Sequence, residues 1–230
     1  MSDASRSVGP PVEAHPARPP GPVTLSGRFG SVMRLDAGRD AAGLWQALRG
    51  HDSVWTYSAH GPFVDEAAFT RWLADREKSK DPYFYVVRDA GDRALGLAAL
   101  MEIRPPMRVI EVGTIVYSPA LQRTALGTET QYLLARYIFD TLGYRRYEWK
   151  CDSLNAPSRR AALRYGFMFE GILRQHMIIK GRSRDTAYFS MLDGEWPARK
   201  HNFERWLAPG NFDDGGGQKC SLAMLNGRKA

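Results

Sequence analysis

Residues 112–129 read VGTIVYSPALQRTALGTE and pass from an apolar strand pattern through a loop into a helical pattern that opens at Thr128. Backbone N–H groups at a helix start, together with the positive end of the helix dipole, suit a phosphate or pyrophosphate. A glycine such as Gly127 lets the backbone approach phosphate oxygens closely. An ordinary strand-to-helix connection explains the same pattern, so this segment alone does not establish a phosphate site.

A second informative segment, residues 155–167, reads NAPSRRAALRYGF. Asn155 is a good cap for a short helix over Pro157–Tyr165, which ends at Gly166. Capping alone accounts for this asparagine. Alternatively, the Asn155 amide and the Ser158 hydroxyl face a cleft beside the preceding strand, where they bind an amide-rich ligand and donate a proton.

The chain around these segments alternates strand and helix patterns. Strands are expected at Val23–Leu35, Tyr83–Arg88, Ala94–Ile103, Val109–Tyr117, Arg145–Cys151, Phe167–Lys180 and Arg184–Leu192. Helices are expected at Asp40–Arg49 behind an aspartate cap, Asp65–Lys78, Thr128–Thr141 and Pro157–Tyr165. Strands that cluster early and a later β-α-β-α-β order predict a mixed sheet covered by helices, in one α+β domain of mixed α/β character.

Both ends of the chain differ from this pattern. Residues 1–22 hold six prolines and almost no large apolar side chains, which predicts a disordered tail. Residues 198–230 form a C-terminal extension that loses periodicity, so we expect a short helix around His201–Leu207 followed by flexible chain. The folded domain is therefore expected over residues 23–197.

Composition limits the function classes. The 230 residues are 43% hydrophobic and 25% charged, which excludes wholesale disorder, and the net charge of +7 suits an anionic partner. No dense Lys/Arg stripe or recognition helix supports nucleic acid binding, so no nucleic-acid partner is expected. No stretch approaches the roughly 18 apolar residues of a membrane span. Two cysteines cannot supply a disulfide framework or a four-ligand zinc site, so no bound metal is expected. Their small number fits a reducing compartment, and we expect a cytoplasmic location.

Taken together, the two segments resemble the GNAT superfamily of acyl-CoA-dependent N-acetyltransferases. The order strand, Gln-x-x-x-x-Gly loop, helix, strand, Asn-x-x-Ser helix and Gly-Phe is present over about residues 25–197. The sequences Thr128-Glu129, Asn155…Ser158 and Gly166-Phe167-Met168-Phe169-Glu170-Gly171 are most similar to the RimJ/RimL-like branch, whose founding members acetylate N-terminal amines of ribosomal proteins. The resemblance implies a central, mostly antiparallel twisted sheet with a splayed parallel strand pair, flanked by about four helices.

The resemblance also implies a site for acetyl-CoA as co-substrate. Its pantetheine arm would lie between the splayed strands, and its pyrophosphate would bind loop amides. The residues implied in cofactor binding are Thr114, Ile115, Val116, Gln122, Arg123, Thr124, Ala125, Leu126, Gly127, Thr128 and Asn155. One departure stands out, because Ala125 replaces a glycine of the usual loop and its methyl group narrows the approach to the pyrophosphate.

Acetyl transfer needs a neutral amine, so a base is useful, most of all for a lysine ε-amine. Glu111 is the first candidate for this base, and Glu102 and His176 are the next. An ordinary exposed carboxylate on a strand would account for the presence of Glu111 equally well. Family members often protonate the leaving thiolate with a tyrosine at a position occupied here by Ala162. The RimJ/RimL-like pattern assigns that role to Ser158 instead.

The acceptor amine is expected to enter between the first two helices and the final hairpin. Trp55, Tyr57, Phe63 and His176 are the candidate substrate-binding residues, although aromatic side chains are more often part of a core. The resemblance thus implies an N-acetyltransferase that acts on a peptide N-terminus or a small amine, with homodimers common among relatives. The alternative is a non-catalytic acyl-CoA-binding regulator, in which Ala125 and Ala162 mark the decay of the site.

Overall fold

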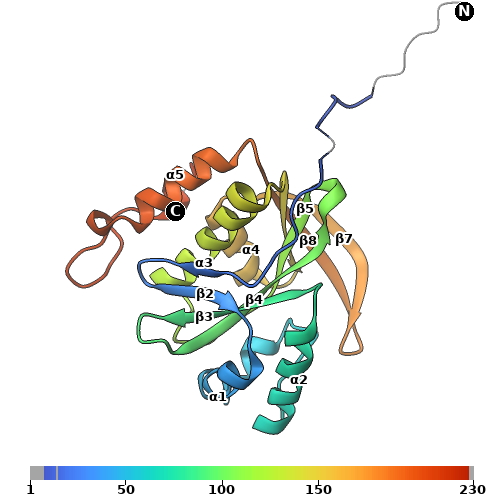
Figure 1. The fold of residues 1–230 in the computed structure, drawn as a ribbon, viewed down its shortest axis with the longest axis vertical. Coiled ribbons are helices and arrows are strands. Elements are labelled where there is room, and N and C mark those ends of the chain that lie inside the picture. Colours follow the sequence, from blue (N-terminus) through green and yellow to red (C-terminus); the bar gives the residue numbers. More distant parts are fainter. Residues whose placement is uncertain (1–7, 14, 228–230) are drawn as a thin grey trace, which may run out of the picture.

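The computed structural model describes residues 8–13 and 15–227, and eight strands form one twisted sheet in the order β1-β2-β3-β4-β5-β6-β8-β7 (Figure 1). Every neighbouring pair is antiparallel except β5 and β6, which are parallel. The strands are β1 Thr24–Ser26, β2 Gly30–Arg34, β3 Tyr83–Asp89, β4 Ala94–Arg104, β5 Val109–Tyr117, β6 Arg146–Asp152, β7 Met168–Ile179 and β8 Arg182–Leu192. The expected mixed, mostly antiparallel sheet with one parallel pair is confirmed.

Helices cover both faces of the sheet (Figure 1). On one face lie α1 (Ala37–Leu48) and α2 (Glu66–Lys78), and on the other lie α3 (Ala125–Arg136) and α4 (Ala156–Tyr165). Strand β3 is buried on both sides as a result, since Phe84 and Val86 pack toward α1 and α2 whereas Tyr85 belongs to the core under α3. This explains its continuous apolar sequence, which is typical of a strand covered on both faces.

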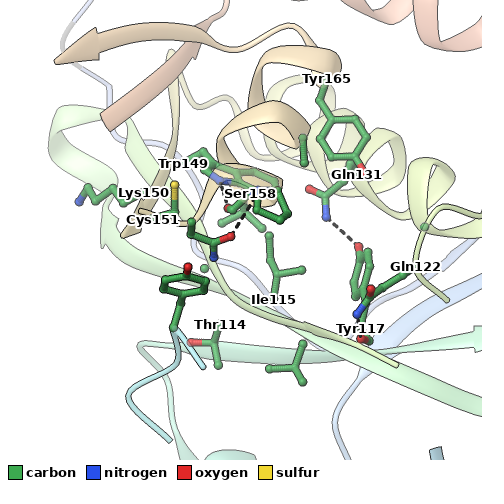
Figure 2. A pocket seen from close by; sticks show the side chains of 18 of the residues that line it. Thr114, Ile115, Tyr117, Gln122, Gln131, Trp149, Lys150, Cys151, Ser158 and Tyr165 are labelled. Carbon is green, nitrogen blue, oxygen red and sulfur yellow. Dashed lines mark hydrogen bonds between the residues drawn. The ribbon is translucent and has the colours of Figure 1, made fainter. Parts of the chain in front are cut away.

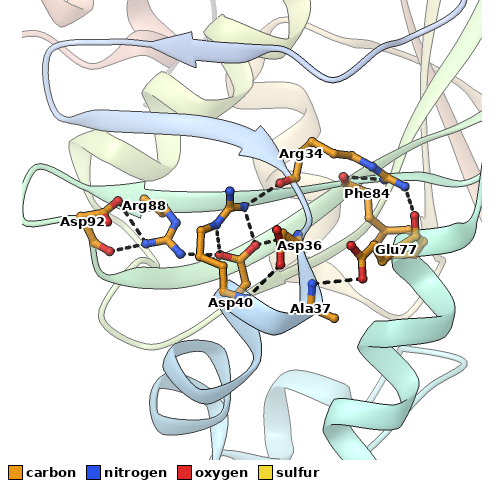
Figure 3. A network of polar contacts seen from close by, with 9 residues as sticks. Arg34, Asp36, Ala37, Asp40, Glu77, Phe84, Arg88 and Asp92 are labelled. Carbon is orange, nitrogen blue, oxygen red and sulfur yellow. Dashed lines mark hydrogen bonds and ion pairs between the residues drawn. The ribbon is translucent and has the colours of Figure 1, made fainter.

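A buried ion pair attaches α1 to the sheet (Figure 3). Asp40 is fully buried and pairs with Arg88 of β3, while its carboxylate also accepts hydrogen bonds from Arg39 and from the Asp36 backbone N–H. Burial by itself would raise the pKa of Asp40, but these three donors hold it below its ordinary value. Arg88 in turn reaches Asp92, 3.1 Å away. The network fixes the start of α1 over the middle of the sheet.

Several boundaries differ from the sequence prediction. Helix α1 starts at Ala37 rather than at Asp40, because the Asp36 side chain caps it by accepting from the Arg39 N–H. The strand expected at Val23–Leu35 is a hairpin, because the N–H groups of Arg28 and Phe29 turn toward the Glu129 carboxylate, 2.6 and 2.8 Å away. Helix α3 begins three residues earlier than predicted, because the Thr124 hydroxyl accepts a hydrogen bond from the Gly127 N–H at 3.0 Å. It continues through a π-helical turn, Tyr137–Leu142.

The terminal segments pack against the domain where they are described. The Ala17 N–H donates to the Pro105 carbonyl, and the Ala17 side chain is buried. After β8 the chain forms α5 (Trp196–Leu207) and the short helix α6 (Leu222–Leu225), which are anchored by buried Phe203, Trp206 and Leu222. The expected tails are therefore ordered in residues 15–22 and 198–227, while the predictions for 1–7, 14 and 228–230 lie outside the described residues. No helix among the described residues is long and apolar enough to cross a membrane.

Candidate functional site

The two parallel strands separate partway along their length. Strand β5 pairs with β6 from Val109 opposite Arg146 to Val112 opposite Trp149, and no pair follows in the described register. Thr114 has a positive φ of 45° and lies where the pairing of β5 with β4 shifts, between Gly113 and Val116. This bulge turns β5 away from β6. Backbone groups from Thr114 to Val116 consequently face a gap rather than a neighbouring strand.

A cavity of about 2040 Å³ runs through this gap, and Figure 2 shows part of its lining. It extends from the start of α3, past β5, β6 and α4, to the β7–β8 hairpin. The residues expected in cofactor binding that line it are Thr114, Ile115, Val116, Gln122, Arg123, Thr124, Ala125, Gly127, Thr128 and Asn155. Leu126 is the exception, because its side chain packs with Val87 and Leu121 in a small buried cluster.

The start of α3 presents unused hydrogen-bond donors to this cavity. The backbone N–H groups from Arg123 to Leu126 donate to no acceptor in the part of the chain that the structure describes. The residue with a positive φ in this loop is Arg123, at 60°, so Ala125 lies in the first helical turn, where its methyl group causes no backbone strain. A Cβ added to Gly127 would approach the Leu121 carbonyl oxygen to 2.9 Å. The geometry fits an anion such as a pyrophosphate.

Ser158 lies on the first turn of α4 beside the open end of β6 (Figure 2). Its hydroxyl oxygen accepts a hydrogen bond of 3.0 Å from the Trp149 indole N–H. Since an indole N–H only donates, Ser158 keeps its own hydroxyl proton, and the neighbouring Cys151 sulfur is an acceptor for it beside the cavity. The Asn155 side-chain oxygen caps α4 at the Ser158 N–H, which leaves the Asn155 amide N–H₂ group for a ligand. Burial raises the pKa of the neighbouring Cys151 thiol, which disfavours a thiolate nucleophile there.

Glu111 belongs to a charged cluster on the opposite strand of the gap. It is 5% exposed, lines the cavity, and its carboxylate lies 2.8 Å from the Lys150 ammonium group. Burial raises the pKa of Glu111 to about 7, against the opposing effect of Lys150. Lys150 also lies 3.3 Å from Glu148, which Arg104 and Arg146 hold at 2.7 Å. Glu111 is thus a carboxylate poised to exchange a proton near neutral pH.

The far end of the cavity contains only part of the expected acceptor slot. Tyr57 and His176 line it, and the His176 Nδ1 lies 3.0 Å from the Thr186 hydroxyl. Trp55 and Phe63 do not line it, so the prediction that they contact substrate is not supported by their positions. Their rings lie 5.3 Å apart in an edge-to-face contact within the core under α1 and α2.

Several lining residues had no sequence prediction. Lys150 faces Glu111 only because of the parallel register, which brings together strands separated by about a helix and two loops. Trp149 orients Ser158 through a bond across the β6–α4 loop. Trp206 and Gln218 come from the C-terminal extension. Alternation along β6, which puts Glu148 and Lys150 on one face, was the one available signal for this cluster.

Comparisons with known proteins agree with this geometry. Residues 33–168 match the family model for the acetyltransferase (GNAT) domain. A GCN5-related N-acetyltransferase from Brucella melitensis is 44% identical, with a TM-score of 0.91 over 93% of this chain and 98% of its own. A probable acetyltransferase of the GNAT family from Chromobacterium violaceum is 43% identical, with a TM-score of 0.79 over 86% of this chain and 100% of its own.

A more distant structure has a ligand. Spermidine N-acetyltransferase from Vibrio cholerae, in complex with CoA and spermine, is 20% identical and shares the fold, with a TM-score of 0.60 over 72% of this chain and 96% of its own. A comparison with curated proteins finds no match. The splayed strand pair, the donor-rich start of α3, the matched domain and the 44% identity lead to one conclusion: the chain belongs to the GNAT acetyltransferase family.

Proposed function

We propose that the protein is an acetyl-CoA-dependent N-acetyltransferase that transfers the acetyl group directly to a primary amine. One observation carries the proposal: the parallel pair opens immediately beside free N–H groups at the start of α3, and both features share a cavity with Ser158 and Glu111. Strand-like hydrogen bonds from Thr114 to Val116 suit pantetheine amides, and the donors of α3 suit a pyrophosphate.

The residues divide the proton transfers between the two sides of the gap. The amine nitrogen attacks the thioester carbonyl carbon, and Glu111, directly or through water, takes the proton that the amine loses as the C–N bond forms. The C–S bond then breaks, the Ser158 O–H gives its proton to the departing sulfur, and Ser158 regains a proton from water while Glu111 releases one to water. Trp149 prevents the Ser158 hydroxyl from pointing away, because the indole occupies one lone pair of the oxygen. Lys150 compensates the charge on ionised Glu111.

The acceptor belongs to one of two chemical classes, a peptide or protein N-terminus or a small-molecule amine. The RimJ/RimL-like motifs favour the peptide class. A Glu111 pKa of about 7 supports the same choice, because α-amines with pKa values near 8 need only a weak base, unlike lysine ε-amines. The two free cysteines fit a reducing, cytoplasmic compartment. A homodimer stays a prediction, to be tested by the mass of the protein in solution.

Thermal unfolding with saturating acetyl-CoA, with ATP and NAD as controls, tests the cofactor. A ligand at 100 times its Kd adds about 2.7 kcal/mol, and each kcal/mol moves the midpoint of a domain of this size by about 2–4 °C. A selective rise of several degrees supports the proposal, and no rise contradicts it. CoA release with a panel of peptides and small amines then tests transfer. Binding without amine-dependent release would favour the acyl-CoA-binding regulator.

A further inference from the structure

The C-terminal extension contributes a wall to the cavity at the end near α3. Trp206, Phe212, Gly217, Gln218 and Ala223 line it, although the matched family domain ends at residue 168. In Figure 1 helix α5 and the loop that follows it lie on the same side of the sheet as α3 and α4. The lining of this end therefore comes partly from residues that follow the region matched by the family model.

Hydrogen bonds hold the extension in a defined shape. The Asn211 side chain accepts from the Cys220 N–H and donates to the Trp206 carbonyl, both at 2.9 Å, which closes the loop between α5 and α6. The Gln218 side-chain oxygen accepts from the Trp206 indole at 2.7 Å. That leaves the Gln218 N–H₂ group, on an exposed side chain, without an acceptor in the described structure. Phe212 packs edge-on against Trp206 at 5.2 Å.

Arg164 connects this wall to the start of α3. Its guanidinium donates to the Thr128 hydroxyl at 3.0 Å and lies 5.0 Å from the centre of the Trp206 ring. Asn226 of the extension donates to the Arg164 carbonyl at 3.0 Å. Burial lowers the pKa of Arg164, and no carboxylate among the described residues forms an ion pair with it. A partly buried cation without a counter-ion is a favourable site for an anion.

Two further arginines line the same end. Arg123 and Arg160 also lack ion pairs with any described carboxylate. Three unpaired cations are more than one pyrophosphate requires, and the aromatic rings and the free Gln218 amide add surface suited to a purine base. CoA carries those groups, an adenine and a ribose 3′-phosphate, beyond its pyrophosphate.

We propose that the extension, residues 206–226, is part of the acetyl-CoA site and binds the nucleotide half of CoA, with Arg164 as the cation that it holds against the phosphates. The inference rests on the proposed function and adds to it a second contact region, which lies after the residues matched by the family model. It gives the protein a preference for the whole cofactor over a shortened acetyl donor with the same reactive thioester.

The test compares two acetyl donors by isothermal titration calorimetry and by initial rates: acetyl-CoA, and acetyl-4′-phosphopantetheine, which lacks the nucleotide. Gln218→Ala and Phe212→Ala should each raise the Kd for acetyl-CoA by roughly 3–10-fold, as expected for one lost hydrogen bond or ring contact, and leave the Kd for the shortened donor within about twofold. Lys219→Ala is the matched control, since Lys219 is exposed on the same loop but does not line the cavity.

Arg164→Met should raise the Kd for acetyl-CoA by roughly 10–100-fold, the range of a lost charge-assisted contact. Arg205→Met, at an exposed position of α5, controls for net charge. Thermal unfolding of each variant without ligand separates misfolding from lost contacts. Equal losses for both donors in the Gln218 and Phe212 variants would overturn the inference, as would wild-type protein that binds both donors equally well. Wild-type protein that binds neither donor would remove the proposed function as well.

Discussion

The replacement of Glu111 by glutamine tests the base most directly. With a pKa of about 7, Glu111 is about one-tenth ionised at pH 6 and about nine-tenths ionised at pH 8. The wild-type kcat/KM should therefore increase with pH around pH 7, which gives the pH profile an ascending limb there. Glu111→Gln keeps the shape but cannot take a proton, so kcat/KM at pH 8 should fall roughly 10²-fold, the lower end of what a positioned base contributes. Below pH 6 the two proteins should converge.

The assay must separate the ionisation of Glu111 from that of the acceptor. Rates of CoA release are measured from pH 5.5 to 9 with two acceptors whose amine pKa values differ by more than one unit. The limb caused by the amine moves with the acceptor, whereas the limb caused by Glu111 does not. The reasoning is refuted if the single wild-type limb follows the amine alone and Glu111→Gln has the same profile.

Lys150 offers an internal check on the same prediction. The ammonium group lowers the pKa of Glu111, so Lys150→Met should move the enzyme limb to higher pH while the variant stays active above it. A merely structural role for the pair would lower the rate equally at every pH. Comparison of unfolding midpoints for wild type, Glu111→Gln and Lys150→Met shows whether the fold is retained.

Three further variants test the site and the scaffold. Ser158→Ala should lower kcat roughly 10²-fold with acetyl-CoA affinity nearly unchanged, and full activity would remove Ser158 from the mechanism. Gly127→Val should abolish cofactor binding, because its Cβ would crowd the Leu121 carbonyl at 2.9 Å, and retained binding in a calorimetric titration would contradict the loop assignment. Asp40→Asn should cost about 3–5 kcal/mol by leaving Arg88 buried without its counter-charge. Folding lowers the pKa of Asp40, so the wild type should exceed the variant in unfolding free energy by the full amount near pH 7 and by less as the pH falls through the acidic range. Denaturant unfolding measures this difference, and a difference that stays constant with pH would contradict the assignment.

Local signals explain how much of the fold was predictable. Asp65 caps α2, and Gly166 ends α4 with a positive φ of 97°, so both helix ends followed from residue type. Apolar runs such as Tyr83–Arg88 marked the strands within one or two residues. The hairpin at residues 24–34 was missed because its turn is held by Glu129, a side chain about 100 residues further along the chain. No local pattern records such a contact.

Some residues of the candidate site could likewise be predicted from local sequence, and others could not. Asn155, Ser158 and Gly127 were found because motif spacing fixes their positions relative to helix starts, and all three line the cavity. Trp55 and Phe63 pack in the core under α1 and α2, and the sequence alone could not distinguish that position from a binding slot. The partner of Glu111 could not be identified either, since it depends on the register between the parallel strands β5 and β6, which α3 separates in the chain.

The strand order also has a consequence for biosynthesis. Strands β1 to β5 each pair with the strand next in the chain, so this half of the sheet can form its hydrogen bonds while translation continues. The gap needs β6, and the cavity wall near α3 needs Trp206 and Gln218, which are made near the end of the described residues. At 5–20 residues per second, the roughly 75 residues after β6 take about 4–15 s to synthesise. A nascent chain can therefore pair half of its sheet seconds before the strands and helices that complete the main core and the cavity have been made.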